Sequence, residues 1–281
     1  EKILSESKVS YIKWDMNRSI TECYSSVLPA QRQGEVYHRY ILGVYDLYER
    51  LTSRFPKILF ESCASGGGRF DPGMLYYAPQ CWTSDDSDAV ERIKIQYGTS
   101  YGYPISSMGT HVSMTPNHQV NRRTPLHTRA NVAYFGTFGY ELDLNALTRE
   151  EQEEVKKQIT FMKQYGHLFQ FGTFYRLKSP FKNNVSAWMV VSEDKKEAVV
   201  GWYRVLNGIN LPCERLRLQG LDASMAYEIN GDGPAHYGDE LMYAGLVTTD
   251  VSSGQADKPE ELSQDFQSRL YILKAVKGGR Q

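Results

Sequence analysis

The chain has 281 residues, of which 41% are hydrophobic and 23% are charged, as in ordinary globular proteins. A net charge of −1 argues against a nucleic-acid-binding surface, and the lack of a long apolar run argues against a membrane span. The length suits one large domain or two.

Strands that alternate with helices are predicted for the first 170 or so residues. Short runs of β-forming residues predict strands near 9–12, 58–62, 81–83, 105–112 and 136–144. Apolar residues three and four apart, with turn and cap signals, predict helices near 35–55, 73–78, 87–97, 125–135 and 148–165. Thr148 and Glu151 form the capping box of the last helix. Strands alternating with helices favour a parallel sheet.

Beyond about residue 172 the pattern changes to alternating and β-branched runs separated by glycine turns. These runs predict strands over 186–192, 197–205, 215–219, 225–229 and 269–276. We therefore expect a small antiparallel β-sandwich without catalytic residues, and a polar loop over 253–265. The predicted domains are residues 1–172 and 173–281.

Polar residues follow three of the predicted strands. Residues 11–18 read Tyr-Ile-Lys-Trp-Asp-Met-Asn-Arg, residues 58–71 contain Glu-Ser-Cys-Ala-Ser-Gly-Gly-Gly-Arg, and residues 80–88 read Gln-Cys-Trp-Thr-Ser-Asp-Asp-Ser-Asp. A sheet holds such groups rigidly at its carboxyl edge, which is typical of an active site. Solvated salt bridges at strand ends are the alternative for any one stretch alone.

These three stretches, in this order, resemble the α-galactosidases of glycoside hydrolase family 36. The resemblance runs almost continuously over residues 11–144 and more weakly to the C-terminus. It implies an α/β fold in which the five strands are strands four to eight of a (β/α)8 TIM barrel, followed by the β-sandwich. It also implies a C-terminal portion of a longer enzyme. A complete open α/β sheet is the alternative, and its two edges would need protection.

Retaining glycosidases use two carboxyl groups roughly 5–5.5 Å apart, one as nucleophile and one as acid and then base. The resemblance implies that Asp15 is the nucleophile and Asp85 the acid/base. Lys13 and Arg18 would keep Asp15 ionised by their positive charge. Asp86 is a rival for the acid/base, because the sequence does not show which side chain faces the barrel axis.

The acidic run after Asp85 has two further interpretations. Negative charge on Asp86 and Asp88 would favour the protonated form that a general acid requires. Asp88 itself is expected to cap the following helix.

Five residues are expected to bind the sugar by the same resemblance: Lys13, Asn17, Cys63, Ser65 and Trp82. Each has a plainer alternative: a salt bridge for Lys13, a buried thiol for Cys63 and core packing for Trp82. Asn17 would hydrogen-bond the sugar or orient the nucleophile. A small side chain at Cys63 and Ser65 would leave room for the axial hydroxyl of galactose.

The glycines at 66–68 lack phosphate-loop spacing and suggest a permissive turn that brings backbone close to a ligand. Arg69 and Asp71 are expected to pair and fix this turn. The histidines show no metal spacing, and we expect neither a metal nor a cofactor.

The predicted function is a retaining α-galactosidase that acts on small oligosaccharides of the melibiose and raffinose type. The alternatives are an α-N-acetylgalactosaminidase, a transgalactosylase, or an inactive fragment that lacks the first barrel strands. Four scattered cysteines, Cys23, Cys63, Cys81 and Cys213, suggest a reducing cytoplasm. The resemblance also implies a homo-oligomer.

Overall fold

A computed structural model describes residues 1–17, 20–208, 214–248 and 265–276. These residues form two compact units, 1–85 with 107–109 and 86–106 with 110–281, and each is described by itself. The two compact units do not coincide with the predicted domains, 1–172 and 173–281. The predicted domain boundary stays a prediction. Arg18, Cys213 and residues 253–264 of the predicted loop lie outside the described residues.

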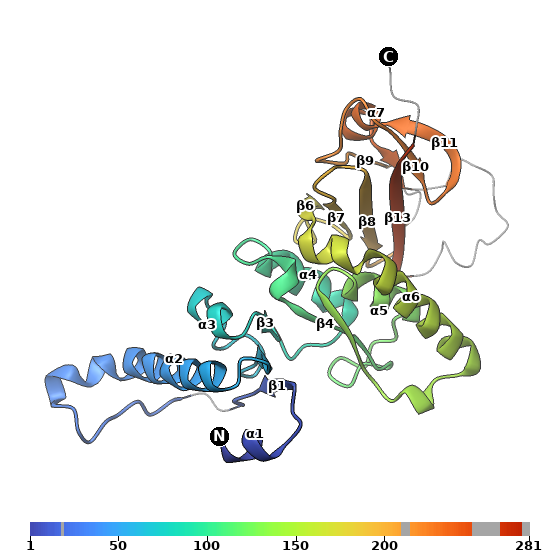
Figure 1. Ribbon diagram of the computed structural model, residues 1–281. Coiled ribbons are helices and arrows are strands. Elements are labelled where there is room, and N and C mark those ends of the chain that lie inside the picture. The colour runs from blue at the N-terminus through green and yellow to red at the C-terminus, as the bar shows by residue number, and fades with distance from the viewer. Residues whose placement is uncertain (18–19, 209–213, 249–264, 277–281) are drawn as a thin grey trace. The chain divides into compact units, whose positions relative to one another are not determined.

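The first unit is built on a parallel sheet with strand order β1-β2-β3 (Figure 1). Its strands and helices are α1 (Lys2–Glu6), β1 (Tyr11–Trp14), the 3-10 helix η1 (Ala30–Glu35), α2 (Val36–Arg54), β2 (Leu59–Ser62), α3 (Pro72–Tyr77) and β3 (Gln80–Cys81). The three predicted strands and both predicted helices are confirmed, with small shifts at their ends. The short helix α1 was not predicted, and β1 starts two residues later than expected.

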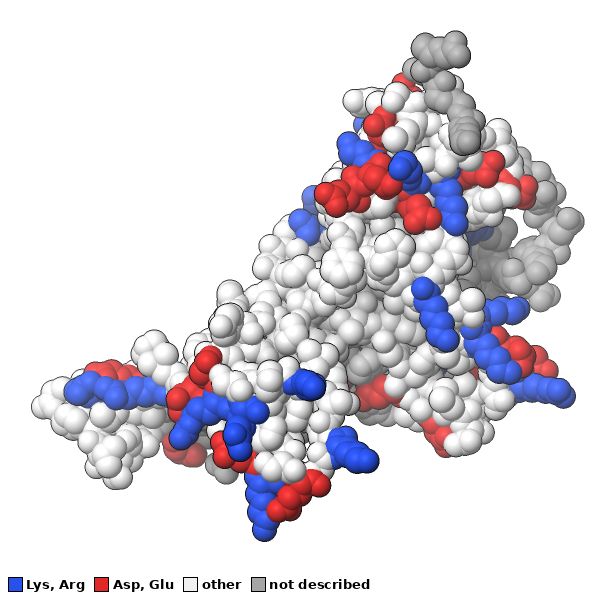
Figure 2. All heavy atoms as spheres, viewed as in Figure 1, with Lys and Arg blue, Asp and Glu red and all other residues white. Residues whose placement is uncertain are grey.

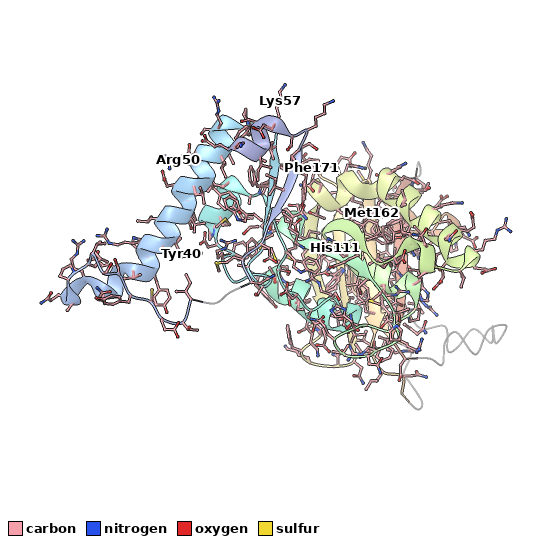
Figure 3. The ribbon with its side chains drawn as sticks, turned by 90° about the horizontal axis from the view of Figure 1, so that it is seen from below. Tyr40, Arg50, Lys57, His111, Met162 and Phe171 are labelled. Atoms are coloured by element: carbon pink, nitrogen blue, oxygen red, sulfur yellow. The ribbon has the colours of Figure 1, made fainter. Side chains whose placement is uncertain are left out.

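Helix α2 forms because its apolar residues recur along one face. Val44 and Tyr48 on that face are buried against Phe60 of β2 and Met74 of α3. The helix ends at Arg54, just before Pro56, whose ring restricts the preceding residue to extended conformations. Tyr40 and Arg50 mark α2 in Figure 3. The packing fixes the strands whose ends carry the candidate residues.

The second unit contains the remaining helices and two short strands. They are α4 (Ala89–Thr99), the 3-10 helix η2 (Ile105–Ser107), β4 (Gly109–Ser113), α5 (Leu126–Ala133), β5 (Thr137–Glu141), the 3-10 helix η3 (Leu144–Ala146) and α6 (Arg149–Phe171). Strands β4 and β5 pair with each other in a sheet of their own. The capping box is confirmed, because Thr148 Oγ1 accepts from Glu151 N at 3.2 Å and Glu151 Oε2 accepts from Thr148 N at 2.9 Å.

The C-terminal part of this unit is an antiparallel sheet of six strands in the order β11-β10-β13-β8-β7-β6 (Figure 1). Its elements are β6 (Thr173–Lys178), β7 (Val185–Val191), β8 (Glu197–Arg204), β9 (Arg215–Leu216), β10 (Ala226–Ile229), β11 (Asp232–Tyr237), α7 (Gly238–Tyr243), β12 (Leu246–Val247) and β13 (Gln267–Val276). All five predicted strands are present. The sequence did not predict β6, β11, β12 or α7.

One face of this sheet forms a large apolar core. Ala187, Met189 and Val191 alternate along β7 and are buried with Leu216 and Leu246 from the small β12-β9 sheet. The missed strand β11 has the sequence Asp-Gly-Pro-Ala-His-Tyr and lies at the exposed edge. Such residues have little β-propensity, and their pairing with β10 comes from tertiary structure.

Acidic and basic side chains are interspersed on the face shown in Figure 2. None of the helices in the described ranges is both long and apolar enough to cross a membrane.

Candidate active site

The candidate residues follow the ends of three adjacent parallel strands. Successive side chains of a strand point to opposite faces, so Lys13 and Asp15 share one face of the sheet. In the strand register Lys13 lies level with Glu61 of β2, and Glu61 lies level with Gln80 of β3. The next position on this face is Asp15 after β1, Cys63 after β2 and Trp82 after β3. The sheet therefore brings together residues that the chain separates widely.

Asp15 is held as a carboxylate by hydrogen bonds. Burial raises the pKa of this carboxyl, but donors from the Cys63 thiol, Met16 N–H, the Asn17 side chain and Ser65 N–H together hold the pKa below its ordinary value. The Met16 N–H lies 2.7 Å from Asp15 Oδ1. A carboxylate with several donors and an exposed surface is suited to attack an electrophilic carbon.

Cys63 supplies one of those donors. Its side chain is 1% exposed, and burial, followed by the hydrogen bond to Asp15, raises the pKa of the thiol to about 11. The thiol therefore stays protonated at neutral pH and donates to Asp15. The predicted contact of Cys63 with a sugar stays a prediction, and the structure places its thiol against the Asp15 carboxylate.

Asn17 and Ser65 complete the surroundings of Asp15. Ser65 Oγ lies 3.4 Å from Asn17 Oδ1, which links the loop after β1 to the loop after β2. Ser65 has a φ of 47°, so it occupies the left-handed region that non-glycine residues rarely adopt. Such a conformation needs support from its surroundings and is common at functional sites.

Lys13 lies over Trp82 and faces Glu61. Its ammonium nitrogen is 4.9 Å from the centroid of the Trp82 ring and 4.0 Å from Glu61 Oε1. Trp82 is 4% exposed, so its packing interpretation has clear support, whereas the Lys13 side chain reaches solvent. We expected Lys13 to keep Asp15 ionised, but hydrogen bonds are the main cause of the lowered pKa.

The glycine turn brings the loop of Asp85 against the loop after β2. A Cβ atom on Gly66 would lie 2.6 Å from Ser84 Cα and 2.9 Å from Asp85 N, and one on Gly67 would lie 2.8 Å from Thr83 O. The glycines therefore allow backbone to meet backbone, and the predicted approach of this turn to a ligand stays a prediction. Asp85 is exposed where the two loops meet. The loop after β2 separates Asp85 from Asp15 in the strand order, because β2 lies between β1 and β3.

The predicted pairing of Arg69 with Asp71 is wrong. Arg69 Nη2 donates to Cys63 O at 2.8 Å and to Trp14 O at 3.4 Å, and thereby ties the ends of β1 and β2 together. Asp71 instead caps α3 by accepting from Met74 N at 2.8 Å. Both residues stabilise the loop after β2, but they do so through backbone groups that the sequence does not reveal.

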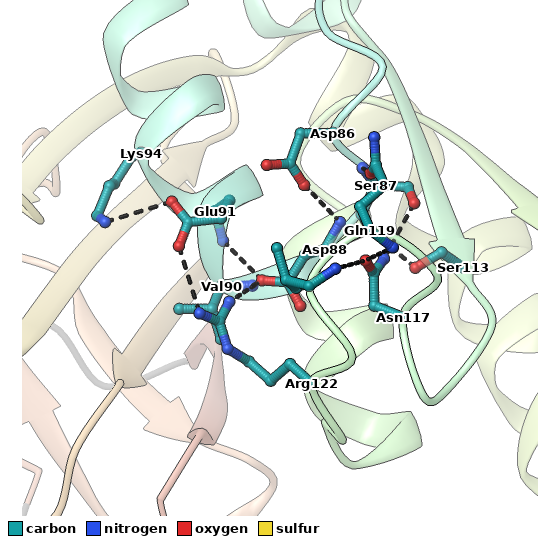
Figure 4. A network of polar contacts seen from close by, with 11 residues as sticks. Asp86, Ser87, Asp88, Val90, Glu91, Lys94, Ser113, Asn117, Gln119 and Arg122 are labelled. Carbon is teal, nitrogen blue, oxygen red and sulfur yellow. Dashed lines mark hydrogen bonds and ion pairs between the residues drawn. The ribbon is translucent and has the colours of Figure 1, made fainter.

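Asp88 caps α4, as predicted, within the polar network of Figure 4. Its Oδ2 accepts from the backbone N–H groups of Val90 and Glu91, both at 3.1 Å, and forms an ion pair with Arg122. The carboxylate is 1% exposed, so Arg122 compensates a buried charge. Asp86 Oδ1 in turn accepts from Asp88 N at 3.0 Å.

Ser87 is held by three hydrogen bonds from the end of β4 and the segment that follows it (Figure 4). Ser113 Oγ donates to Ser87 O at 2.7 Å, Asn117 Nδ2 to Ser87 Oγ at 3.1 Å, and Ser87 N to Gln119 Oε1 at 3.1 Å. The sequence did not predict these hydrogen bonds. The residues that they join lie about 30 residues apart without any local motif, so only the folded chain identifies them.

A pocket of about 270 Å³ adjoins the loop after β1. Its lining residues are Met16, Ile20, Tyr37, Tyr40, Ile41, Ala64, Ser65, Gly68 and Arg69. Within the described ranges, no three side chains of the His, Cys, Asp or Glu type are grouped so that they could hold a metal ion. The candidate site offers the exposed carboxyl groups of Asp15 and Asp85 on the loops after β1 and β3, and paired carboxyl groups are what acid–base and nucleophilic chemistry on a sugar requires.

Comparison with known proteins identifies the family of the chain. The family model described as melibiase matches residues 1–172, and the model for the C-terminal domain of glycosyl hydrolase family 36 matches residues 185–273. The chain is 56% identical to α-galactosidase AgaA of Geobacillus stearothermophilus and 48% identical to α-galactosidase Mel36A of Lactobacillus acidophilus, over 98% of its length in each case. It spans 36% of the length of each relative.

Solved structures give the same result. The crystal structure of AgaA superimposes with a TM-score of 0.90 at 55% identity, over 98% of this chain and 37% of that one. An α-galactosidase from Lactobacillus brevis gives a TM-score of 0.91 at 52% identity, over 100% and 37%. An AgaA variant solved in complex with raffinose gives 0.89 at 55% identity, over 97% and 36%.

Proposed function

This chain belongs to glycoside hydrolase family 36, and we propose that it carries the catalytic carboxyl groups of a retaining α-galactosidase. The substrates would be melibiose- and raffinose-type oligosaccharides with a terminal α-D-galactosyl residue. The observation that carries the proposal is Asp15, kept ionised by converging hydrogen bonds at the end of β1. Asp85 follows β3, and the glycine turn after β2 lies between the two in the strand order. AgaA variants were solved in complex with raffinose and with stachyose, which supports this substrate class.

The reaction follows from the two carboxyl groups. Asp15 attacks the anomeric carbon while Asp85 gives its proton to the departing glycosidic oxygen, which leaves a galactosyl group covalently bound to Asp15. Asp85 then takes a proton from water, and this water attacks the anomeric carbon and frees Asp15. Two inversions retain the anomeric configuration.

The choice of Asp15 and Asp85 as the pair of carboxyl groups has independent support in the relatives. The aspartates replaced in the raffinose-bound and stachyose-bound AgaA variants are as far apart in sequence as Asp15 and Asp85. Replacing an aspartate in a complex with an intact substrate is the usual way to prevent turnover. This spacing favours Asp85 over Asp86 as the acid/base.

The finer architecture is part of the proposal. Strands β1 to β5 would be strands four to eight of a (β/α)8 barrel over residues 1–172, and residues 173–281 would form a β-sandwich. The parallel β1-β2-β3 order and the parallel bridge between Cys81 and Met108 support the barrel. The two-layer core of the C-terminal sheets supports the sandwich.

Lys13, Asn17, Cys63, Ser65 and Trp82 would line the galactose subsite. The Lys13 ammonium and the Asn17 amide would bind sugar hydroxyls, and the small side chains of Cys63 and Ser65 would leave space for the axial hydroxyl. The packed Trp82 ring would form the floor under Lys13. The proximity of Asn17, Cys63 and Ser65 to the Asp15 carboxylate supports this subsite.

The test is nitrophenol release from nitrophenyl α-galactoside by two proteins. One is the 281-residue chain; the other is AgaA in which these residues replace the matching segment, which is 56% identical. We expect the graft to be active and Asp15→Asn to abolish its activity. An inactive graft, or an active Asp15→Asn graft, would refute the proposal. Equal rates on the N-acetylgalactosaminide would favour the alternative substrate.

The role of Asp85 can be tested separately through the leaving group. Asp85→Ala should slow raffinose hydrolysis by about 10²–10⁴-fold, the usual contribution of a general acid. It should slow formation of the galactosyl-enzyme far less with a dinitrophenyl galactoside, because that leaving group needs no proton. Equal losses on both substrates would show that Asp85 is not the acid.

Two further features of the whole protein are proposals. A reducing, cytoplasmic location is supported by the free thiols of Cys23, Cys63 and Cys81. Self-association is supported by Tyr11 and Leu59, which are exposed apolar neighbours on strands β1 and β2. Light scattering tests the second proposal, and a single monomer would contradict it.

A further inference from the structure

Glu61 is a buried carboxylate that the two-acid reaction does not use. It lies in β2, is 3% exposed, and occupies the face of the sheet that also carries the candidate active-site residues. In the strand register Glu61 lies level with Lys13, one side-chain position before Asp15 and Cys63 on the same face. Burying a charge is costly unless it is paired and hydrogen-bonded, so this position calls for an explanation.

The partners of Glu61 are Tyr11 and Lys13, both from β1. The Tyr11 hydroxyl donates to Glu61 Oε2, and burial, followed by this hydrogen bond and the negative charge of Glu61, raises the pKa of the phenol. Lys13 Nζ lies 4.0 Å from the other oxygen, Oε1. Within the described part of the chain, Oε1 has no hydrogen-bond donor. The carboxylate is therefore fixed by Tyr11 and directs its second oxygen at Lys13.

Lys13 is held from two directions. The Glu61 carboxylate attracts the ammonium from the adjacent strand, and the Trp82 ring lies 4.9 Å from it as a cation–π partner. A lysine side chain has a flexible stem of four carbons and loses much conformational entropy when it is ordered. Two anchors supply this ordering before a sugar arrives, which lowers the cost of binding.

We propose that Glu61 is a positioning residue that fixes the Lys13 ammonium beside the nucleophile for binding of a galactose hydroxyl. This inference rests on the proposed function of the site. Lys13 and Asp15 lie on the same strand face two residues apart, so an unrestrained ammonium would be drawn to the Asp15 carboxylate. Attraction to Glu61 keeps the ammonium level with Lys13 and Glu61 in the sheet, one side-chain position before Asp15. There it can bind substrate without neutralising the Asp15 carboxylate.

The kinetic consequence differs from that of a merely structural ion pair. Binding that is equal in the ground state and the transition state appears in KM and leaves kcat unchanged. Glu61→Gln keeps the shape and the Tyr11 contact but removes the charge that orders Lys13. We expect it to raise KM about tenfold and to change kcat less than twofold.

A double-mutant cycle in the AgaA graft tests the inference. In a Lys13→Met background the same Glu61→Gln substitution should change KM less than twofold, because the group it positions is gone. Equal effects in both backgrounds would refute the positioning role. Glu61→Asp, which keeps the charge, should recover part of the loss and remains informative if Glu61→Gln fails to fold.

Controls separate this inference from the function on which it rests. Glu49→Gln, on the exposed surface of α2, should leave both constants unchanged. Activity that survives Asp15→Asn would overturn the proposed function and the inference together. If the activity of the graft depends on Asp15 but Glu61→Gln and Glu49→Gln give the same KM and kcat, the inference is overturned and the proposed function stands.

Discussion

Replacing Gly66 by alanine places a methyl group where the backbone before Asp85 already lies. The added Cβ would be 2.6 Å from Ser84 Cα and 2.9 Å from Asp85 N, whereas ordinary contacts begin at 3.4 Å. The loop must therefore move by about 0.8 Å, and such overpacking costs about 1–3 kcal/mol. Gly66 also has a φ of +79°, which costs an alanine about 1–2 kcal/mol. The total loss of stability is about 2–5 kcal/mol.

The same displacement should impair catalysis, because it moves Asp85, the proposed acid/base, relative to Asp15, the proposed nucleophile. A misplacement of about 1 Å can cost on the order of 100-fold in rate. We would measure kcat/KM on nitrophenyl α-galactoside in the AgaA graft, and urea unfolding of the chain by tryptophan fluorescence. Two of the four tryptophans, Trp14 and Trp82, lie in the first unit.

Gly43→Ala is the matched control for this experiment. Gly43 lies within α2, and a Cβ atom added there would have no neighbour within 4 Å. Alanine should therefore stabilise the helix by about 0.5–1 kcal/mol and leave the kinetics unchanged. Unfolding midpoints and rates that are the same for Gly66→Ala and Gly43→Ala would show that the glycine turn does not hold the Asp85 loop.

Two further predictions concern pH dependence and stability. Cys63→Ala removes a donor from Asp15, so the pKa of Asp15 should rise from its lowered value toward the ordinary 3.8. In the proposed mechanism ionised Asp15 is the active form, so kcat/KM of the Cys63→Ala graft should begin to fall at a higher pH than kcat/KM of the wild-type graft. An unchanged acid limb of kcat/KM would contradict this cause. Cys63→Ser, which keeps a donor, should lie closer to wild type. Arg122→Ala leaves the buried Asp88 carboxylate without its cation and should lower the free energy of unfolding by about 3 kcal/mol. Arg50→Ala breaks only an exposed pair and should cost less than about 1 kcal/mol in the same urea titration, and a similar loss for both arginines would argue against burial as the cause.

The amino-acid sequence by itself determined the alternation of strands and helices in the first half and the change to antiparallel strands after residue 172. These features follow from local patterns: apolar spacing in α2, the Thr148 capping box and the Asp88 cap, each of which acts within a few residues. The motifs after β1, β2 and β3 also indicated the family, because they reflect chemistry rather than shape.

Only the tertiary structure decided which residues the candidate site brings together. The donors Cys63 and Ser65 to Asp15, the cation–π contact of Lys13 with Trp82, and the bond of Arg69 to Trp14 O all join segments that belong to different strands or follow them. The edge strand β11 and the network around Ser87 likewise depend on segments far apart in the chain. Local propensity cannot specify such contacts, because each depends on the register of strands that pair only when the chain folds.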